Sequence, residues 1–314
     1  GIQKVLKDIH EAVREEYNAK IVGTIPFDKV HKDLQIIKDE YIRFVNPFMF
    51  RNSIVIVHER KFLPLFWLLN HIFFQKVEVV YIHHNIFNNH RRLSLMPKTV
   101  VAISEEGVRN LETYFKVPVI NIHKIYNAVK DIDPPVHVFY HSKYVRILYP
   151  ARINSIKRQL EIIHHLRGRI SNNIKIIFAG TGPQAAILES EIVDSPNFVF
   201  LGYRSDIFHL LHTFDYIMLF SKQEGLPISL IEADMMGTPA VCNNVGGNTE
   251  IIHDGENGFV VNDWNALIRC LNSLSNVSEK EYLRMSFNAR SKYLENFTFE
   301  AFKKNYLKLL KSLG

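Results

Sequence analysis

The sequence contains few cysteines and no cluster of metal-binding side chains. Its 314 residues include two cysteines, Cys242 and Cys270, and neither has a cysteine or histidine partner at zinc-binding spacing. Such a chain cannot rely on a disulfide framework, so we expect a reducing, cytoplasmic compartment. The first residues also lack a basic segment followed by an apolar one, so we expect no secretory signal in them.

The sequence also lacks a bilayer-spanning apolar run and a tract of one charge. Its most apolar stretch, residues 62–74, is interrupted by Pro64, Asn70 and His71 and predicts a core helix. The net charge of +6 is spread over both halves, whereas nucleic-acid domains usually concentrate their basic residues. We therefore expect no nucleic-acid polymer as ligand. A weakly basic surface suits anionic small molecules or an acidic membrane face.

What the sequence does contain is an alternation of β-rich runs and helical patterns. Strands are expected at residues 20–25, 54–58, 77–83, 100–104, 119–125, 145–149, 175–179, 198–201, 216–220, 239–243 and 258–260. This order is typical of parallel sheets with crossover helices. The length favours two domains, and residues 131–135, with two prolines, form the expected linker. We expect an α/β fold with two Rossmann-like domains, residues 1–142 and 143–314, that face a cleft.

The first domain begins unusually, because residues 2–15 already have the pattern of an amphipathic helix. In a doubly wound domain a glycine such as Gly1 ends a strand-to-helix turn, so we expect that the first strand is missing. The alternative is a fold that simply begins with a helix.

The most informative segment covers residues 215–237. A buried strand at 216–220 and a turn at 221–226 lead into a helix at 227–236, which begins at Pro227 and ends before Gly237. The N-terminus of that helix favours an anion such as a phosphate. Glu224 and Glu232 can accept hydrogen bonds from hydroxyl groups, which suits a sugar or ribose.

Two other segments follow predicted strands and carry groups suited to phosphate. Arg152 and Lys157 come after the strand at 145–149, where two cations are well placed for a diphosphate. Gly180 and Gly182 form a glycine turn after the strand at 175–179, which is a weak signal by itself.

Together these segments resemble the donor domain of glycosyltransferase family 4, whose members are retaining enzymes of the GT-B architecture. The matching motifs are Arg152 with Lys157, the turn at 180–183, the two-glutamate segment 224–233, and segments 237–241, 245–252 and 257–258. Two positions depart from the family pattern, because Ala151 and Arg158 stand where the family has glycines. The first half resembles the acceptor domain more weakly, through residues 101–105 and 125–129.

The resemblance implies a role for each residue. Arg152 and Lys157 would hold the donor diphosphate, Glu232 would bind ribose hydroxyls, and Glu224 would face the transferred sugar. The other implied donor-binding residues are Gly180, Gly182, Gly225, Leu226, Pro227, Ile228 and Ser229. Gly1 would belong to an acceptor-side phosphate loop, and His83 or His84 would contact the sugar.

Other titratable residues have weaker claims to the site. His58 and Glu59 end a strand and form a second candidate for the cleft. His209 and His212 share a helix face, but with no third ligand in sight we interpret them as packing or surface residues. Asp131 and Asp133 resemble a metal-binding acidic motif, but their position in a proline-bearing linker argues against that role.

We therefore expect a metal-independent, retaining hexosyltransferase of polysaccharide biosynthesis, with no cofactor. It would move a sugar from a nucleotide diphosphate sugar to a glycan or lipid-linked acceptor. The alternatives are a non-catalytic sugar-nucleotide-binding or scaffold protein, and a GT-B epimerase or phosphorylase. The resemblance also implies that helix 299–313 can cross back onto the first domain. A basic, apolar group predicts peripheral contact with the inner membrane face; its members are Arg51, Arg60, Lys61, Phe62, Leu63, Phe66 and Trp67. The alternative is that the aromatic members belong to the core.

Overall fold

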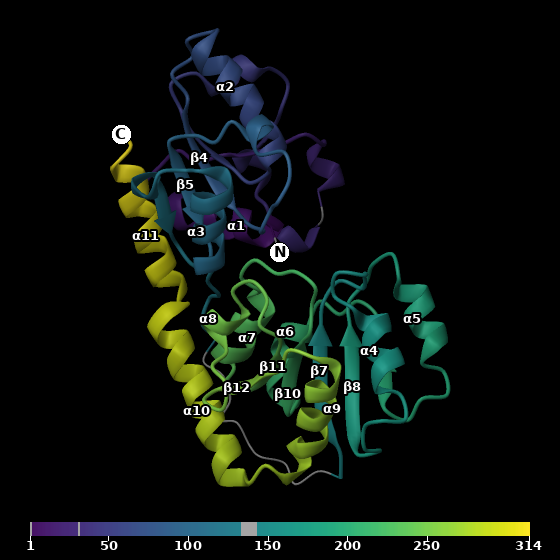
Figure 1. Cartoon of the computed structure of the whole chain (residues 1–314). Coiled ribbons are helices and arrows are strands. Elements are labelled where there is room, and N and C mark those ends of the chain that lie inside the picture. Colours follow the sequence, from purple (N-terminus) through teal and green to yellow (C-terminus); the bar gives the residue numbers. More distant parts are fainter. Residues whose placement is uncertain (1, 31, 133–142) are drawn as a thin grey trace. The chain divides into compact units, whose positions relative to one another are not determined.

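The computed structural model describes residues 2–30, 32–132 and 143–314, which form two compact units (Figure 1). The first unit runs to residue 128 and includes residues 299–314, and the second covers residues 129–298. This division lies earlier than the predicted boundary at 142/143. Its physical basis is a bridge between Val129 and Thr298, together with a 3.2 Å hydrogen bond from the Val129 amide to the Phe297 carbonyl. Most of the predicted linker, including Asp133, and Gly1 lie outside the described residues.

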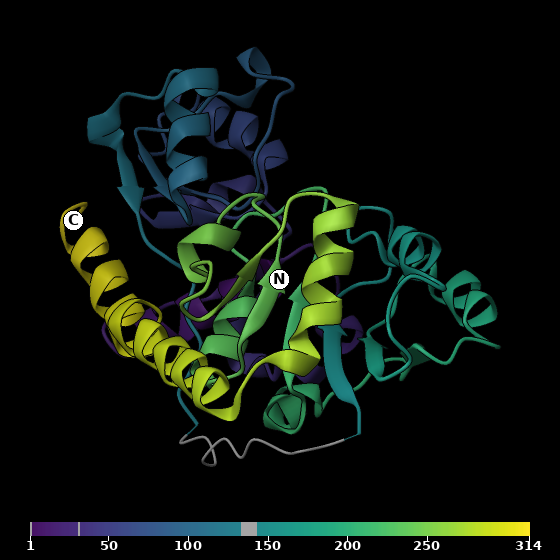
Figure 2. The ribbon, with the colours of Figure 1, turned by 60° about the horizontal axis from the view of Figure 1, so that its bottom comes forward.

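The second unit is a six-stranded parallel sheet with the order β12-β11-β10-β7-β8-β9. Its helices pack around the sheet (Figures 1 and 2). The strands are β7 (Val145–Pro150), β8 (Ile174–Ala179), β9 (Phe198–Phe200), β10 (Tyr216–Leu219), β11 (Ala240–Cys242) and β12 (Gly258–Val260). The helices are α4 (Gln159–Leu166), α5 (Ala185–Glu191), α6 (Ile207–Leu210), α7 (Ile228–Met235), α8 (Asn248–Ile251), α9 (Trp264–Ser273) and α10 (Glu279–Asn296). The central strands are nearly continuous apolar runs, as expected of a parallel sheet covered by helices.

The strand order creates a switch point beside β7. Along the chain β7 is followed by β8 on one side, whereas β10 pairs with its other side. In open parallel sheets the loops at the carboxyl ends of such strands diverge and leave room for a ligand. The loops after β7 and β10 are the segments that carry Arg152, Lys157 and Glu224.

The first unit contains two separate parallel sheets, β1-β2 and β3-β4-β5-β6. The strands are β1 (Ile21–Gly23), β2 (Tyr41–Arg43), β3 (Ile54–Val57), β4 (Glu78–His83), β5 (Thr99–Ala102) and β6 (Ile122–Lys124). The helices are α1 (Ile2–Val13), α2 (Leu63–His71), α3 (Glu105–Asn110) and α11 (Phe299–Lys311). Strand β2 was not predicted, and the predicted strand at 119–125 begins with a 3₁₀ turn at Val119–Asn121.

An apolar cavity of about 610 Å³ lies between the two sheets of the first unit. It is lined by residues of β1 and of β3, which do not pair with each other, and by residues of α1 such as Ile9 and Val13. In the part of the chain that the structure describes, no strand fills this space. This is the position at which a strand that leads into α1 would lie in a doubly wound sheet.

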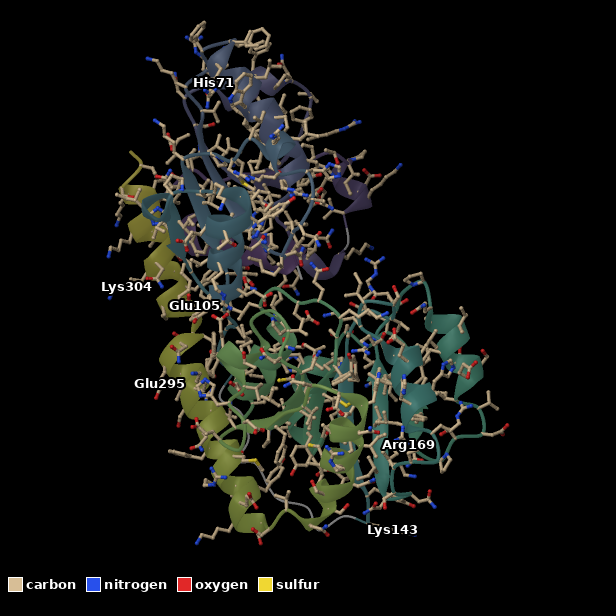
Figure 3. The ribbon with its side chains drawn as sticks, viewed as in Figure 1. His71, Glu105, Lys143, Arg169, Glu295 and Lys304 are labelled. Carbon is tan, nitrogen blue, oxygen red and sulfur yellow. The ribbon has the colours of Figure 1, made fainter. Side chains whose placement is uncertain are left out.

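Helix α2 agrees only in part with the predicted core helix, because one face is buried and the other is exposed. Leu63, Phe66 and Leu69 pack into the core of the first unit. Trp67 and Leu68 are exposed, and His71 lies at the end of the helix (Figure 3). The prediction that Leu63 and Phe66 belong to a membrane-facing group was therefore wrong, because they face the sheet.

Helix α11 belongs to the first unit. It packs against α1 (Figure 1), and Lys303 and Lys311 pair with Glu15 and Glu16, which follow the end of α1. Its apolar face, including Phe302 and Tyr306, is buried. Within the described residues, no helix is long and apolar enough to cross a membrane.

Candidate active site

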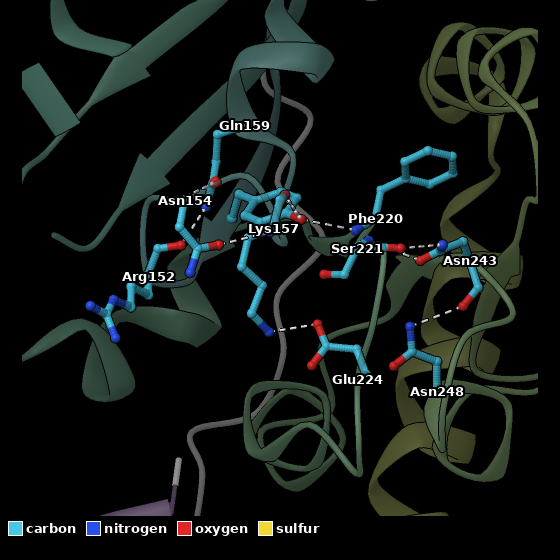
Figure 4. A network of polar contacts seen from close by, with 10 residues as sticks. Arg152, Asn154, Lys157, Gln159, Phe220, Ser221, Glu224, Asn243 and Asn248 are labelled. Atoms are coloured by element: carbon cyan, nitrogen blue, oxygen red, sulfur yellow. Dashed lines mark hydrogen bonds and ion pairs between the residues drawn. The ribbon is translucent and has the colours of Figure 1, made fainter. Parts of the chain in front are cut away.

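The centre of the candidate site is an ion pair between the loops that follow β7 and β10. The Lys157 Nζ lies 2.5 Å from the Glu224 Oε1 (Figure 4). Glu224 is 7% exposed and Lys157 is 22% exposed, so the pair is largely shielded from water. The structure thus brings together two of the residues that the sequence placed in one site.

The loop that carries Lys157 is held by polar side chains that the sequence did not single out. The Lys157 amide donates to Asn154 Oδ1 at 3.0 Å. Gln159, which is fully buried, donates to the Arg152 carbonyl at 3.0 Å. These bonds fix the loop at both ends and direct Lys157 towards Glu224.

The Tyr149 hydroxyl joins the two loops directly. It donates to the Lys157 carbonyl at 2.7 Å and accepts from the Phe220 amide at 3.1 Å. Tyr149 lies on β7 and is completely buried, which raises the pKa of its phenol far above the usual range. Sequence reasoning missed this residue because a tyrosine in an apolar strand run looks like any core side chain.

The loop after β10 is fixed from the other side by Asn243. Its side chain accepts from the Ser221 amide at 3.0 Å and donates to the Ser221 carbonyl at 2.8 Å (Figure 4). Asn248 in turn donates to the Asn243 carbonyl at 2.9 Å. The Asn243 side chain thus makes both hydrogen bonds that a neighbouring strand would offer to the Ser221 backbone, and this restricts the movement of the loop.

Arg152 is exposed and extends from the same loop as Lys157 but away from Glu224 (Figure 4). Among the described residues its side chain has no hydrogen-bond or ion-pair partner. A guanidinium that the fold leaves without a partner is available for an incoming anion. Arg158, by contrast, pairs with Glu161 and stacks on Trp264, with 4.3 Å from its guanidinium carbon to the ring centre.

The backbone conformation of Arg158 explains why the family pattern has a glycine at this position. Its φ of 60° lies in the left-handed region, which costs a non-glycine residue about 1 to 2 kcal/mol. The stacking on Trp264 and Phe220 helps to hold it there.

The two glycines of the turn after β8 act through close packing. A Cβ on Gly180 would lie 2.1 Å from the Ala151 carbonyl oxygen, and one on Gly182 would lie 2.2 Å from that of Ile153. Only glycines allow this turn to lie against the Arg152 loop. Their contribution in the structure is to place Arg152, and a direct contact with the donor stays a prediction.

Helix α7 presents one partly exposed face. Ile228, Ser229 and Glu232 are half-buried, whereas Gly225, Leu226, Pro227 and the other helix residues up to Met235 are buried. Positions 228, 229 and 232 share one side of a helix, so Glu232 and the first turn of α7 are accessible together. The backbone N–H groups of that first turn and the helix dipole favour an anion there.

The fully buried carboxyl group on α7 is Asp234, which the sequence did not single out. It accepts from Asn257 Nδ2 at 3.1 and 3.2 Å, and burial raises its pKa well above the usual range. It therefore acts as a buried hydrogen-bonding group inside the second unit. Glu232, two residues earlier, remains the carboxylate that a ligand can reach.

The two neighbouring histidines of the first unit have different surroundings. His83 is buried among aromatic rings and its Nε2 lies 2.9 Å from Asn110 Oδ1. The His84 Nε2 lies 2.9 Å from the His58 Nδ1. Both rings line a cavity of about 440 Å³, which is also lined by Arg60 and Lys61. Of the two candidates, His84 is the one that a ligand of this cavity can reach.

Burial keeps all three histidines neutral. It lowers the pKa of His58 to about 4, that of His83 to about 4 and that of His84 to about 3. One ring nitrogen of His58 or His84 must donate in the bond between them, and the other must accept. A neutral imidazole can position a hydroxyl group but cannot supply positive charge.

The remaining candidates have different surroundings. Glu59 lines the same cavity as His58, whereas Asp131 forms an ion pair with Arg290 at 2.7 Å. His209 is exposed and His212 is half-buried. Among the described residues, no group of three histidine, cysteine or acidic side chains could hold a metal ion. Metal independence stays a prediction.

Comparison with known proteins relates the second unit to sugar-transferring enzymes. Residues 144–276 match the family described as Glycosyl transferases group 1, which confirms the predicted resemblance to glycosyltransferases for this part of the chain. A Bacillus subtilis protein named Putative glycosyltransferase EpsD is 32% identical over 121 residues, which are 37% of this chain and 32% of that protein. An Escherichia coli protein named UDP-Gal:alpha-D-GlcNAc-diphosphoundecaprenol alpha-1,3-galactosyltransferase is 33% identical over 98 residues, 31% of this chain and 25% of that protein. The chain thus spans about a third or less of these curated relatives.

Solved structures confirm the predicted fold class. Anabaena Alr3699/HepE in complex with UDP superposes with a TM-score of 0.82 and 18% identity, covering 99% of this chain and 96% of that chain. The lipopolysaccharide outer core galactosyltransferase WaaB superposes with a TM-score of 0.80 and 15% identity, covering 100% of this chain and 96% of that chain. The fold is the GT-B fold of these glycosyltransferases.

Proposed function

We propose that this chain is a retaining glycosyltransferase that moves a sugar from a nucleotide diphosphate sugar to a lipid-linked or glycan acceptor. The premise is the match of residues 144–276 to Glycosyl transferases group 1. The observation that carries the proposal is the shielded Lys157–Glu224 pair beside the N-terminus of α7, with Arg152 exposed on the same loop. This arrangement supplies positive charge for a diphosphate and a carboxylate for sugar hydroxyls at one sheet edge.

In this proposal the second unit binds the donor. Arg152, Lys157 and the first turn of α7 hold the diphosphate, and Glu232 accepts hydrogen bonds from ribose hydroxyls. Similar structures support a nucleotide donor, since HepE was solved with UDP and with UDP and glucose. No cofactor is part of the proposal.

The chemical step follows from the charges. The bond between the anomeric carbon and the diphosphate oxygen breaks, and the acceptor oxygen forms its bond to the same face of that carbon. The acceptor proton passes to the departing diphosphate, whose growing negative charge is stabilised by Lys157, Arg152 and the helix N-terminus. Glu224 is bound to Lys157 and positions sugar hydroxyls, so it is not the attacking nucleophile.

We propose a lipid-linked acceptor and peripheral contact with the inner face of a membrane. Support comes from relatives whose names include diphosphoundecaprenol acceptors. The free cysteines, Cys242 and Cys270, agree with the cytoplasmic side of that membrane.

A panel of nucleotide diphosphate sugars, with products separated and counted, tests the activity. We expect release of nucleotide diphosphate together with a glycosylated acceptor, and proton NMR of the first-formed product should show the donor's anomeric configuration. Binding without turnover would favour a non-catalytic protein. A free epimerised sugar nucleotide, or phosphate as the required acceptor, would favour an epimerase or phosphorylase, and an inverted product would exclude the retaining mechanism.

A further inference from the structure

The residue that follows Lys157 is the centre of a group of side chains, which we name the Arg158 cluster. Its members come from three parts of the second unit: the loop after β7 with the first turn of α4, the loop after β10, and the start of α9. They are Arg158, Glu161, Phe220, Lys222 and Trp264. The cluster therefore includes a direct chain neighbour of Lys157 and, in Lys222, a residue two positions before Glu224.

Stacking joins Arg158 to two aromatic rings outside its own loop. Its guanidinium carbon lies 4.3 Å from the centre of the Trp264 ring and 5.0 Å from that of Phe220. The two rings also contact each other, with 4.9 Å between their centres. A guanidinium is attracted by the negative face of an aromatic ring and can pack flat against it. Arg158 is thus packed against the loop after β10 and against the start of α9.

Ion pairs join the same two loops a second time. The Arg158 Nε lies 3.0 Å from Glu161 Oε2, and the Lys222 Nζ lies 2.6 Å from the other oxygen, Oε1. The Lys222 amide donates to the Ile156 carbonyl at 2.8 Å. The Arg158 side chain is 18% exposed, so its pair is better shielded than an ordinary surface ion pair. The loops that carry Lys157 and Glu224 are therefore connected through side chains and through the backbone.

The backbone of Arg158 adopts a conformation that its contacts must maintain. Its φ is 60°, and among the described residues of the second unit no other non-glycine residue has a positive φ. Such a conformation persists only where the surroundings fix it, and residues of this kind gather at functional sites. Here the surroundings are the two aromatic rings and Glu161. The contacts of Arg158 thus fix the backbone directly beside Lys157.

We propose that Arg158 is a positioning residue, which clamps the loop after β7 to the loop after β10 and so holds Lys157 against Glu224. Its guanidinium is already engaged by Glu161 and Trp264, so Arg158 acts through Lys157 and not on the donor. The consequence for sugar transfer rests on the proposed function, whereas the clamp between the two loops does not.

The clamp should affect turnover more than donor affinity. A cation that stabilises charge in the transition state must stand in the correct place before the bond breaks, and a displacement of about 1 Å can cost about a hundredfold in rate. The diphosphate of the bound donor is held in addition by Arg152 and the first turn of α7. Loss of the clamp should therefore leave most of the binding intact.

The first measurement is hydrogen–deuterium exchange of the full chain without ligand, because it reports on the loops alone. In the Arg158→Gly variant, the amides of Lys157 and Lys222 should exchange about tenfold or more faster than in the parent chain. Glycine relieves the left-handed backbone while the contacts are lost, so the two effects oppose each other. The midpoint of thermal unfolding should therefore shift by less than about 3 °C.

The second measurement compares turnover with binding in the same variant. UDP serves as the probe for binding, because the similar HepE structure was solved with UDP. We expect Arg158→Gly to lower kcat about tenfold or more and the affinity for UDP less than about threefold. A residue with a purely structural role would not separate these two quantities.

Matched variants separate the clamp from the backbone and from the charge. Lys116, an exposed residue of the first unit, also has a φ of 60°, so Lys116→Gly removes the same charge and the same strain. It should leave loop exchange and kcat unchanged. Arg158→Lys keeps the charge but loses the flat stacking, so its kcat should fall between those of the parent chain and Arg158→Gly. Trp264→Leu, combined with Arg158→Gly, should add little further loss.

Four outcomes would overturn the proposal. The first is unchanged exchange of both amides in Arg158→Gly, which would turn any loss of turnover into the loss of a direct contact. The second is unchanged kcat in an active chain whose loops exchange faster. The third is full kcat in Arg158→Lys, which would assign the effect to charge alone, and the fourth is additive losses from Arg158→Gly and Trp264→Leu. A chain that binds no UDP and transfers no sugar would overturn the proposed function, while the exchange rates would still decide whether the clamp exists.

Discussion

Lys157 and Glu224 are separated by 67 positions in the chain, yet their side chains meet at 2.5 Å at the switch point of the second sheet. Lys157 lies in the loop after β7 and Glu224 in the loop after β10, and these two strands pair with each other. The Tyr149 hydroxyl forms hydrogen bonds with both loops. The pair is thus a consequence of strand order, and it places a cation and an acceptor of hydroxyl hydrogen bonds next to each other.

Lys157→Ala should lower kcat about a hundredfold and donor affinity less than about tenfold, because the charge that it stabilises grows only as the bond to the diphosphate breaks. The variant also leaves Glu224 buried without its partner, at a cost of about 1 to 3 kcal/mol in stability. Glu224→Gln in the same chain should restore much of that stability but not the turnover. Lys280→Ala is the control. An equal loss in kcat and in affinity would contradict the assigned role.

Glu232→Ala should weaken the binding of nucleoside diphosphates while leaving the fold intact. A helix accepts alanine readily, whereas the ribose hydroxyls lose their acceptor. Calorimetric titration should show a drop in affinity of about tenfold. Glu189→Ala, at an exposed position of α5, should bind normally. Unchanged affinity in the Glu232 variant would remove this residue from the site.

Turnover should survive EDTA. In the proposed mechanism, Arg152, Lys157 and the N-terminus of α7 supply the positive charge that a divalent cation supplies in other transferases. The measurement is the initial rate before and after chelation. Activity that EDTA abolishes and manganese restores would refute metal independence.

Tyr149→Phe should destabilise the protein by about 1 to 3 kcal/mol, because the change keeps the ring but leaves the Phe220 amide and the Lys157 carbonyl without their buried partner. The two loops also lose their direct link, so donor affinity should fall with stability. Urea unfolding and donor titration measure the two effects. Tyr306→Phe is a suitable control, since the hydroxyl of that buried tyrosine has no hydrogen-bond partner among the described residues.

Stability should fall as the pH is lowered from about 6.5 towards 4. The folded chain keeps His58, His83 and His84 neutral down to about pH 4, 4 and 3, whereas the unfolded chain binds protons below its ordinary histidine pKa of about 6.5. Each histidine can contribute up to about 1.4 kcal/mol per pH unit in this window. Urea unfolding at several pH values should therefore show a shallower slope for His84→Gln than for the parent chain. A His209→Gln control should keep the parent slope, and parallel curves for all three chains would contradict the prediction.

Much of the second unit could be predicted because its signals are local. Buried parallel strands appear as apolar runs, and Pro227 and Gly237 mark the limits of α7 within about one residue. The supporting groups Tyr149 and Asn243 could not be predicted, because they act through partners 71 and 22 positions away. In the first unit the pattern of residues 62–74 was apolar on both sides, so it could not distinguish the buried Leu63 and Phe66 from the exposed Trp67 and Phe74.

The position of α11 also determines when the first unit can finish folding during synthesis. Residues 2–128 leave the ribosome first, but α11, which packs on α1, begins at Phe299. At ordinary rates of translation the intervening residues, 129–298, take roughly 10 to 30 seconds to make. Throughout that interval the face of α1 that α11 covers stays uncovered in the nascent chain. A chain that ends before Phe299 would lack α11, so this face of α1 would stay exposed to water.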